Sequence, residues 1–456
     1  MQQHFAKTTS SYVSPAHGAL ASMFAPILTR IVLDREKWHI SMMTLDPHGA
    51  GRLRECHVCG LVQSLPELPR GAVARCAQCR AVLRRRRTDP HGRALAMAVT
   101  GLMLFGLATQ MPFMELRIGT NAVGAGLATG PEALNAVGAW PMAAAVLVTT
   151  IGAPLIKMLA TIWVLIGIRR HPPAPHLARV FAWVERLSPW SMVEVFLLGV
   201  FVAYTKLIDM AQVEIGGALY ALGALMLTMA ATDAVMDDAA VWDRLGHPAP
   251  APPGRVIACL CCDLVVAASE THCPRCGSAL HHRRPGSIGQ SWALLIAATL
   301  LYIPANLLPV LNLASFGRVQ SSTILAGVME LAASGMWPLA ALVFIASVMV
   351  PVLKVLGMGI LLISTQLGAA GYLRERSAIY RVVESIGRWS MIDVFMISIL
   401  TALVHLDRLA TITPGPGAVC FCGVVVLTML AAMRFDPRLM WDAAGQTGCD
   451  EAETEA

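Results

Sequence analysis

Charged residues are scarce in this chain of 456 residues, since Asp, Glu, Lys and Arg together make up only 14% of it. A typical soluble domain contains about 25% of them. Hydrophobic residues make up 56% of the chain, and the mean hydropathy is +0.60. These values exclude a disordered chain, a collagen-like chain and an ordinary cytosolic enzyme. They predict a multi-pass membrane protein, in which neighbouring helices satisfy the backbone groups that its Gly and Pro residues free.

Common catalytic motifs are also missing. The sequence has no GxxxxGK[ST] phosphate loop, no GxSxG elbow and no HExxH helix. We therefore expect no enzyme activity. No cleavable signal peptide is predicted either, because the first long apolar run begins near Ala94, directly behind a run of four arginines, Arg84 to Arg87. The first membrane helix is expected to act as the targeting signal.

Eight apolar stretches approach or exceed the roughly 20 residues that cross a hydrocarbon core of about 30 Å. The third and seventh have the shortest charge-free cores. The predicted spans are residues 94–114, 139–168, 191–210, 213–232, 289–311, 336–364, 390–407 and 411–433.

The distribution of Lys and Arg predicts how these spans are oriented. Of the 35 such residues, 29 lie in the segments 1–93, 169–191, 232–289, 365–390 and 434–456. Arg117, Lys206, Arg318 and Arg408 lie in the connections between those segments. This asymmetry follows the positive-inside rule, so the basic segments and both chain ends are predicted to be cytoplasmic. The membrane orientation of the chain therefore explains its net charge of +6, and we expect no nucleic-acid partner.

The chain also contains a tandem repeat. Early motifs recur at an offset of 197 residues and later ones at 199. The paired motifs are Cys76-x2-Cys79 with Cys273-x2-Cys276, Trp140-Pro141 with Trp337-Pro338, Pro154-x2-Lys157 with Pro351-x2-Lys354, Trp190-Ser-Met-Val-Glu194-Val-Phe with Trp389-Ser-Met-Ile-Asp393-Val-Phe, and Trp242-Asp243 with Trp441-Asp442. Four spans per repeat give both copies one orientation, related by a pseudo-two-fold axis along the membrane normal.

The predicted fold is therefore an all-α multi-pass membrane protein with two tandem four-helix transmembrane modules, each preceded by a small zinc-ribbon, rubredoxin-like head. The predicted domains are an N-terminal extension at 1–50, head 1 at 51–90, membrane module 1 at 91–240, head 2 at 254–285, membrane module 2 at 286–436 and an acidic C-terminal tail at 437–456.

Each head carries two CxxC motifs. Four thiolates at such spacing can converge tetrahedrally on one metal ion, and a domain this small needs such a staple to fold. The predicted ligands are Cys56, Cys59, Cys76 and Cys79 in head 1, and Cys259, Cys262, Cys273 and Cys276 in head 2.

We expect two zinc ions per chain at these ligands. Iron is the less favoured metal, although the run from Cys273 to Gly277 is similar to a rubredoxin knuckle. Disulfides are the alternative that a reducing cytoplasm disfavours. The extra thiol of Cys261, beside Cys262, leaves the ligand choice of head 2 slightly ambiguous.

Two lysines lie deep inside apolar runs. Lys157 is about 18 Å from the end of its predicted helix at a rise of 1.5 Å per residue, too far for its ammonium to reach the headgroups easily. Lys354 is its repeat, and each lysine follows a proline by three residues. Proline bends a helix and frees a carbonyl. Each lysine either lines a polar path or pairs structurally with a carboxylate or freed carbonyls, and the sequence leaves both open.

Glu194 and Asp393 each follow a serine by three positions at the start of a predicted span. This spacing is typical of a capping box, which is the favoured interpretation. The functional alternative is that each carboxylate pairs with the lysine of the preceding span, which would place Lys157, Lys354, Glu194 and Asp393 on one transport path.

The order of these motifs over residues 52–443 resembles the paraquat-inducible protein A family of Gram-negative inner membranes. Members are linked to MCE-domain proteins, which form periplasmic tunnels. The resemblance implies an inner-membrane subunit that handles phospholipid between that membrane and an MCE-protein tunnel. Alternatives are a secondary transporter of a small solute, which would use the lysines, and a metal- or redox-sensing protein built on the heads.

Overall fold

The computed structural model describes residues 52–66, 68–69, 71–87, 90–118, 121–170, 172–208, 212–246, 255–315, 318–404 and 410–445. The predicted N-terminal extension and residues 446–456 of the predicted tail, including Cys449, lie outside them. The described residues belong to one compact unit, Pro47–Ala456. We call residues 52–87 head 1, 90–246 the first half, 255–285 head 2 and 287–445 the second half.

Eight helical segments in the described residues are long and apolar enough to cross a membrane, which confirms the predicted number. They are His91–Gln110, Trp140–Gly167, His176–Leu207, Gly217–Val235, Ser287–Leu307, Trp337–Gln366, Leu373–Leu403 and Pro416–Arg434.

The third and seventh segments differ from the prediction. They begin at His176 and Leu373, about 15 residues before the expected starts at 191 and 390. The added parts are amphipathic helices, and their apolar side chains, such as Phe181 and Tyr380, are buried. The prediction that residues 169–191 and 365–390 are loops is therefore wrong over most of their length. The charged residues on the polar face of each helix led to the loop assignment, although the opposite face is apolar.

The first half consists of α2 (Pro90–Gln110), β5 (Met114–Ile118), β6 (Asn121–Ala125), α3 (Thr129–Ala136), α4 (Trp140–Leu147), η1 (Val148–Gly152), α5 (Ala153–Gly167), α6 (His176–Leu187), η2 (Ser188–Trp190), α7 (Val193–Leu207), β7 (Gln212–Ile215), α8 (Gly217–Val235) and α9 (Asp238–Leu245).

The second half runs through α10 (Ser287–Leu307), β10 (Leu311–Ser315), β11 (Arg318–Ser322), α11 (Ile324–Ala333), α12 (Trp337–Phe344), η3 (Ile345–Met349), α13 (Val350–Gln366), α14 (Leu373–Ile386), η4 (Gly387–Met391), α15 (Ile392–Leu403), β12 (Ala410–Pro414), α16 (Pro416–Arg434) and α17 (Leu439–Ala443).

Four of the eight spans contain an irregular turn. In the second and sixth spans this turn is a π-helix, η1 or η3, directly before a proline at the start of α5 or α13. In the third and seventh spans it is a 3₁₀ turn, η2 or η4, which separates α6 from α7 and α14 from α15. Irregular backbone at membrane depth is tolerated where protein surrounds it or where it lines a wet cavity.

The connections opposite the heads contain strands that the sequence did not predict. Strands β5, β6 and β7 form one antiparallel sheet, and β10, β11 and β12 form another. In each sheet the hairpin that precedes a short helix pairs with a strand from later in the same half. Helix α11 follows the second of these hairpins, and the Thr323 side chain caps its first turn.

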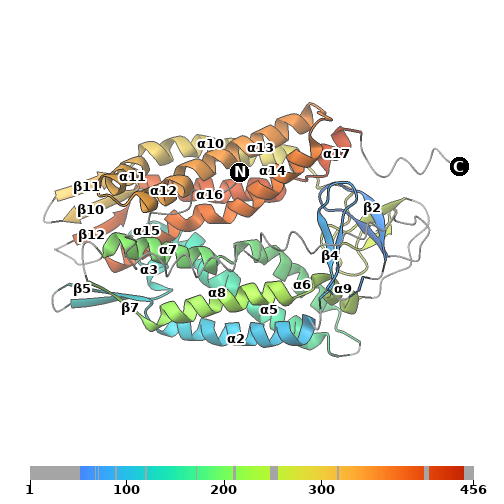
Figure 1. Ribbon diagram of the computed structural model, residues 1–456, viewed down its shortest axis with the longest axis horizontal. Helices are drawn as coiled ribbons and strands as arrows, with labels where there is room; N and C mark the ends of the chain where they lie inside the picture. The colour runs from blue at the N-terminus through green and yellow to red at the C-terminus, as the bar shows by residue number, and fades with distance from the viewer. Residues whose placement is uncertain are drawn as a thin grey trace, which may run out of the picture. The chain divides into compact units, whose positions relative to one another are not determined.

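The helices pack most extensively in two pairs, α2 with α8 and α10 with α16, which lie side by side in Figure 1. Between the halves, α7 contacts α15, where the rings of Phe196 and Phe395 are 5.6 Å apart. A Cβ at Gly199 would lie 2.9 Å from the Cβ of Phe395, so this close approach requires glycine. The seventh span is the most enclosed of the eight, since 78% of its most apolar stretch is buried inside the protein.

Candidate functional site

The two heads are built from short β-hairpins. Head 1 contains β1 (Arg52–Glu55) paired with β2 (Val62–Leu65) and β3 (Val73–Arg75) paired with β4 (Val82–Arg85). Head 2 contains β8 (Val256–Ala258) paired with β9 (Val265–Ala267), followed by a bridge between His272 and Ala279. A CxxC motif lies in each turn.

The four CxxC turns share one backbone conformation. The residue after the second cysteine has a positive φ, which is +77° at Gly60, +60° at Arg80, +55° at Asp263 and +73° at Gly277. Its N–H donates to the carbonyl of the first cysteine, at 2.8 Å for Gly60 and 2.9 Å for Gly277. The left-handed residue closes the turn, so that both cysteine side chains point to the same side.

Four buried Sγ atoms meet in each head. The two sets are those predicted from the sequence, and within each set all Sγ atoms lie within 4.8 Å of one another. Cys56 Sγ is 3.4 Å from Cys79 Sγ, and Cys262 Sγ is 3.5 Å from Cys273 Sγ. A disulfide needs about 2.05 Å, whereas tetrahedral zinc bonds of about 2.3 Å place sulfurs roughly 3.8 Å apart. Both clusters could therefore bind a metal ion, and they contain no disulfide.

Cys261 lies outside the second cluster. Its backbone N–H donates to Cys259 Sγ at 3.4 Å, and its side chain is partly exposed. The hydroxyl of Ser278 contacts Cys259 Sγ at 3.1 Å and Cys276 Sγ at 3.0 Å. The geometry therefore selects the set that omits Cys261.

Each head packs against the half that does not follow it in the sequence. The buried residues of head 1, including Cys56 and Cys76, belong to a core with Tyr380 and Trp441 of the second half. The buried residues of head 2 belong to another core with residues of the first half, including Phe181 and Trp242. The Arg374 guanidinium adds a hydrogen bond of 3.0 Å to the carbonyl of Gln78 in head 1. The heads thus link the two halves crosswise.

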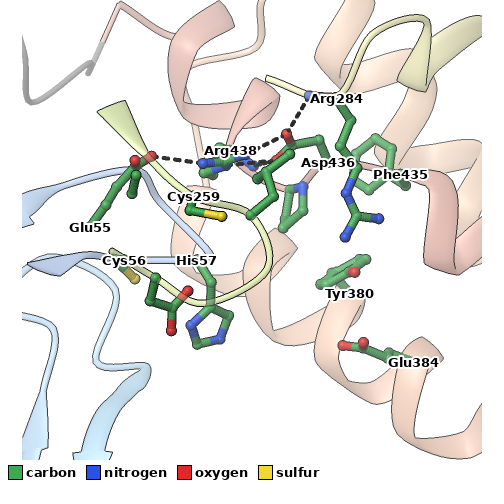
Figure 2. Close-up of a pocket in the computed structure, with 14 residues that line it drawn as sticks. Glu55, Cys56, His57, Cys259, Arg284, Tyr380, Glu384, Phe435, Asp436 and Arg438 are labelled. Atoms are coloured by element: carbon green, nitrogen blue, oxygen red, sulfur yellow. Dashed lines mark hydrogen bonds and ion pairs between the residues drawn. The ribbon is translucent and has the colours of Figure 1, made fainter. Parts of the chain in front are cut away.

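A buried charge cluster fixes head 1 to the second half (Figure 2). Arg438 Nη1 donates to Glu55 Oε1 at 2.8 Å, and Arg438 Nη2 donates to Asp436 Oδ2 at 2.9 Å. Arg283 of head 2 donates to the same Glu55 oxygen at 3.2 Å and to Asp442 at 2.6 Å. Burial opposes ionisation of Asp436, but the hydrogen bonds and charge of Arg438 outweigh it and lower the pKa of Asp436 below its ordinary value. Asp436 therefore stays ionised near neutral pH.

The predicted membrane lysines both reach the 3₁₀ turn of the following span. Lys157, which is 6% exposed, donates to Asp233 Oδ2 at 2.8 Å and to the Ser188 hydroxyl at 3.2 Å. Asp233 lies near the end of α8, and its side chain is 49% exposed. Lys157 is therefore an ion-paired lysine, as the structural interpretation expected.

Lys354 has a different environment. It is 2% exposed, and its ammonium donates to the carbonyl of Gly387 at 3.3 Å and to the hydroxyl of Ser390 at 3.4 Å. No carboxylate lies within ion-pair distance of it among the described residues. The offset of 199 residues places Ala432 where the first half has Asp233. Lys354 therefore lacks the carboxylate partner that Asp233 provides to Lys157 in the first half.

Asp393 is the second residue after η4, and it is 5% exposed. Neither of its carboxylate oxygens has a hydrogen-bond partner among the described residues. Lys206 of the first half and Ser347 are the polar groups that act on it electrostatically, although the Ser347 hydroxyl donates to Val343 O at 2.6 Å. The turn at η4 thus holds a buried lysine and a buried carboxylate without a direct bond between them.

The capping interpretation is wrong at both positions. Neither α7 nor α15 has a side-chain cap. Ser191 Oγ has no hydrogen-bond partner among the described residues, and Ser390 Oγ accepts from Lys354. Glu194 does not pair with Lys157 either. It accepts from Arg388 Nη1 of the other half at 3.3 Å, in a pair that is largely exposed.

Asp233, Lys206 and Arg388 were missed by reasoning from the sequence. Asp233 had a detectable signal, because it directly follows the predicted fourth span and could face a lysine in the second. Lys206 and Arg388 had none, since each acts across the boundary between the halves.

Comparison with known proteins identifies relatives over most of the chain. Residues 92–246 and 288–445 match the family described as Paraquat-inducible protein A. The chain is 34% identical to Lipophilic envelope-spanning tunnel protein A of Escherichia coli K12 over 86% of its length and 92% of the relative. It is 32% identical to Intermembrane transport protein PqiA of the same organism, over 89% of the chain and 99% of the relative.

A more distant relative is the Probable intermembrane transport protein of Haemophilus influenzae, with 26% identity over 88% of the chain and 97% of the relative. No solved structure matches the chain. The predicted resemblance is confirmed, and the eight apolar helices agree with a multi-pass membrane protein. The chain belongs to the paraquat-inducible protein A family.

Proposed function

We propose that this protein is the membrane subunit of a lipid-transport system, and that it handles phospholipid between the bacterial inner membrane and a periplasmic tunnel formed by an MCE-domain partner. The names of its relatives, an intermembrane transport protein and a lipophilic envelope-spanning tunnel protein, support a transport role. The observation that carries the proposal is the buried ammonium of Lys354 beside the broken seventh span.

Broken helices support this role because they place polar groups inside the membrane. Discontinuous membrane helices form the substrate and ion sites of many transporters. Here the ammonium of Lys354 lies at the end of α14, where the helix dipole is negative, and the carboxylate of Asp393 lies in the first turn of α15, where it is positive. The helix dipole and the Gly387 carbonyl stabilise the ammonium, and the dipole of α15 stabilises the carboxylate, so each remains available to a lipid phosphate or an ammonium group.

In the first half, the equivalent charged residues are already paired. Lys157 is held by Asp233, and Glu194 is engaged with Arg388. We therefore assign the transport path mainly to Lys354 and Asp393, with Lys157 as its ion-paired counterpart and Glu194 as a link between the halves.

The remaining assignments complete the proposal. Two tandem four-helix modules lie in the inner membrane, with the heads and both chain ends in the cytoplasm, as the Lys and Arg distribution predicts. The four thiolates of each head hold one zinc ion, which closes the metal shell and makes the heads structural rather than catalytic.

The test is Lys354→Met, which removes the charge and keeps similar volume and apolarity. Because no carboxylate in the described ranges pairs with Lys354, the change strands no described partner charge, and protein level and thermal stability should hold or rise. Lipid transfer to an acceptor should fall at least about tenfold if the ammonium contributes a charged hydrogen bond to the path. Leu353→Met, at the exposed neighbouring position, is the matched control. Full transfer by Lys354→Met at normal protein level contradicts the assigned path.

The partner is tested separately. Affinity purification from intact membranes should recover an MCE-domain protein and phospholipid together with this chain. Recovery of neither, under conditions that keep other membrane complexes intact, contradicts the proposed function as a whole.

A further inference from the structure

A cavity of about 170 Å³ lies where both heads meet the second half. Glu55 and His57 of head 1 and Asp263 of head 2 contribute to its walls. Head 2 also contributes Arg284, just before α10, and the second half contributes residues from α14 and from the segment after α16, among which Tyr380, Glu384, Phe435 and Asp436 are labelled in Figure 2.

The charged groups of this cavity fall into two kinds. Arg438 donates to both Glu55 and Asp436, and these three residues form a fixed wall. Arg284 and Glu384 also line the cavity, and neither forms an ion pair among the described residues, although one Nη of Arg284 donates to the carbonyl of Met433. The groups without a counter-charge in this set are therefore one guanidinium and one carboxylate.

Tyr380 lies between these two groups in Figure 2, and both act on it electrostatically. The residue is 8% exposed and lines the cavity. A ligand or water in the cavity can therefore complete a hydrogen bond with its hydroxyl. The cavity thus presents a cation, a hydroxyl and an anion in sequence.

In the first half, the residues equivalent to Glu384 and Tyr380 are engaged with other side chains. The offset of 199 residues matches Glu384 with Glu185 and Tyr380 with Phe181. Glu185 Oε1 accepts from Trp242 Nε1 at 2.9 Å, and the Phe181 ring packs on that tryptophan at 5.1 Å.

In the second half the matching tryptophan turns elsewhere. Trp441 Nε1 donates to the Ser377 hydroxyl at 3.2 Å and leaves Glu384 without that donor. One repeat therefore satisfies its carboxylate internally, whereas the other exposes a carboxylate and an added hydroxyl to a cavity.

The size of the cavity limits its ligand. One water needs roughly 10–15 Å³ of such space, and a pocket that encloses a drug-sized ligand takes about 300–1,000 Å³. The observed volume fits a group of several heavy atoms but not a whole lipid. An arginine guanidinium suits phosphate, and a carboxylate with a phenol suits a primary ammonium.

We propose that this cavity binds the zwitterionic headgroup of a phospholipid, with its phosphate on Arg284 and its primary ammonium on Glu384 and Tyr380. The ligand source is the membrane leaflet on the side of the heads, because the lining residues lie on or beside the ends of three membrane-crossing helices, α10, α14 and α16. This inference deepens the proposed lipid-handling function by naming a headgroup class, and it rests on that function only for the identity of the lipid source.

In the experiment, the full-length chain is delipidated in detergent and then incubated with phosphatidylethanolamine or phosphatidylglycerol that carry identical acyl chains. Native mass spectrometry measures how much of each added lipid the protein retains. We expect preferential retention of phosphatidylethanolamine, reduced about tenfold by Glu384→Gln and by Arg284→Gln, since each removes one charged hydrogen-bond partner. Tyr380→Phe should reduce it less. Glu375→Gln on the same helix and Glu185→Gln in the other half are the charge-matched controls and should retain the wild-type preference.

Equal retention of both lipids, or a preference that survives Glu384→Gln and Arg284→Gln, overturns the proposal. Free O-phosphoethanolamine distinguishes the source: binding of this compound with the same variant dependence, without binding of the lipid, overturns a lipid origin. These failures concern headgroup binding alone, because the proposed transport function is tested through Lys354→Met and partner recovery.

Discussion

At the scale of single residues, the main contrast lies between two lysines at equivalent positions of the repeat. Lys157 has a carboxylate partner at 2.8 Å, whereas Lys354 has a carbonyl and a hydroxyl. Both lysines lie well inside long apolar runs of the sequence. The sequence therefore predicted that they are buried, but it could not distinguish their partners. That difference depends on Asp233, which approaches Lys157 only after α8 folds back beside the earlier helices, and on Ala432, which stands at the equivalent position of the repeat and offers no carboxylate.

The lysine pair gives a prediction about stability. Asp233→Ala leaves Lys157 as an uncompensated buried cation and should destabilise the protein by about 3 to 5 kcal/mol. Lys157→Met should cost less, because the remaining Asp233 side chain is half exposed and can be solvated. The double variant should recover most of the stability lost in Asp233→Ala, as measured by thermal unfolding in detergent. A double variant no more stable than Asp233→Ala contradicts the pairing.

Asp436 gives a prediction about pH. Its pKa is lowered below the ordinary value of 3.8, so its contribution to stability is fully present above that value and is lost as pH falls through the folded pKa. Asp436→Asn should lower the thermal midpoint at pH 7, because Arg438 then loses an ionised partner. The gap between variant and wild type should close as the pH is lowered below 3.8. A gap that stays constant down to pH 3 would show that Asp436 does not act through its charge.

At the scale of elements, composition and length predicted the eight spans well, because a long apolar run has few alternatives to a membrane helix. The breaks were less accessible. Pro154 and Pro351 indicated a bend and coincide with the π-helical turns. The turn at η4 contains no proline, and its position became visible only through the amphipathic helix α14 that precedes it. The strands of the far-side sheets are five residues or shorter, which leaves too short a pattern to recognise.

The contact between α7 and α15 can be tested with two glycines. Gly199→Ala places a methyl group 2.9 Å from Phe395 Cβ and should destabilise the protein by about 1 to 3 kcal/mol, because this interface has no room to expand. Gly223→Ala in α8 meets nothing within 4 Å and should be neutral or stabilise by up to about 1 kcal/mol through helix propensity. Thermal midpoints in one detergent compare the two, and equal effects would argue against tight packing between the halves.

At the scale of the whole molecule, the crosswise packing of the heads is the feature that the sequence could not show. The CxxC spacing determines a local fold, and the repeat suggests that each head belongs with the module after it. Instead, the core of head 1 includes Trp441, and the core of head 2 includes Trp242. Each head also has an arginine that pairs with the half after it in the sequence, as Arg84 does with Asp243 and Arg283 with Asp442.

This arrangement predicts that each metal site stabilises the opposite half. Two metal ions per chain are expected by elemental analysis, and Cys76→Ser or Cys273→Ser should each remove one. Since a small metal-stapled head unfolds without its ion, Cys76→Ser should release head 1 from the second half. Hydrogen–deuterium exchange should then increase in α14 and α17, whereas Cys273→Ser should increase it in α6 and α9. If each variant instead loosened the half that follows its own head in the sequence, the crosswise contacts would not be the ones that hold the two halves together.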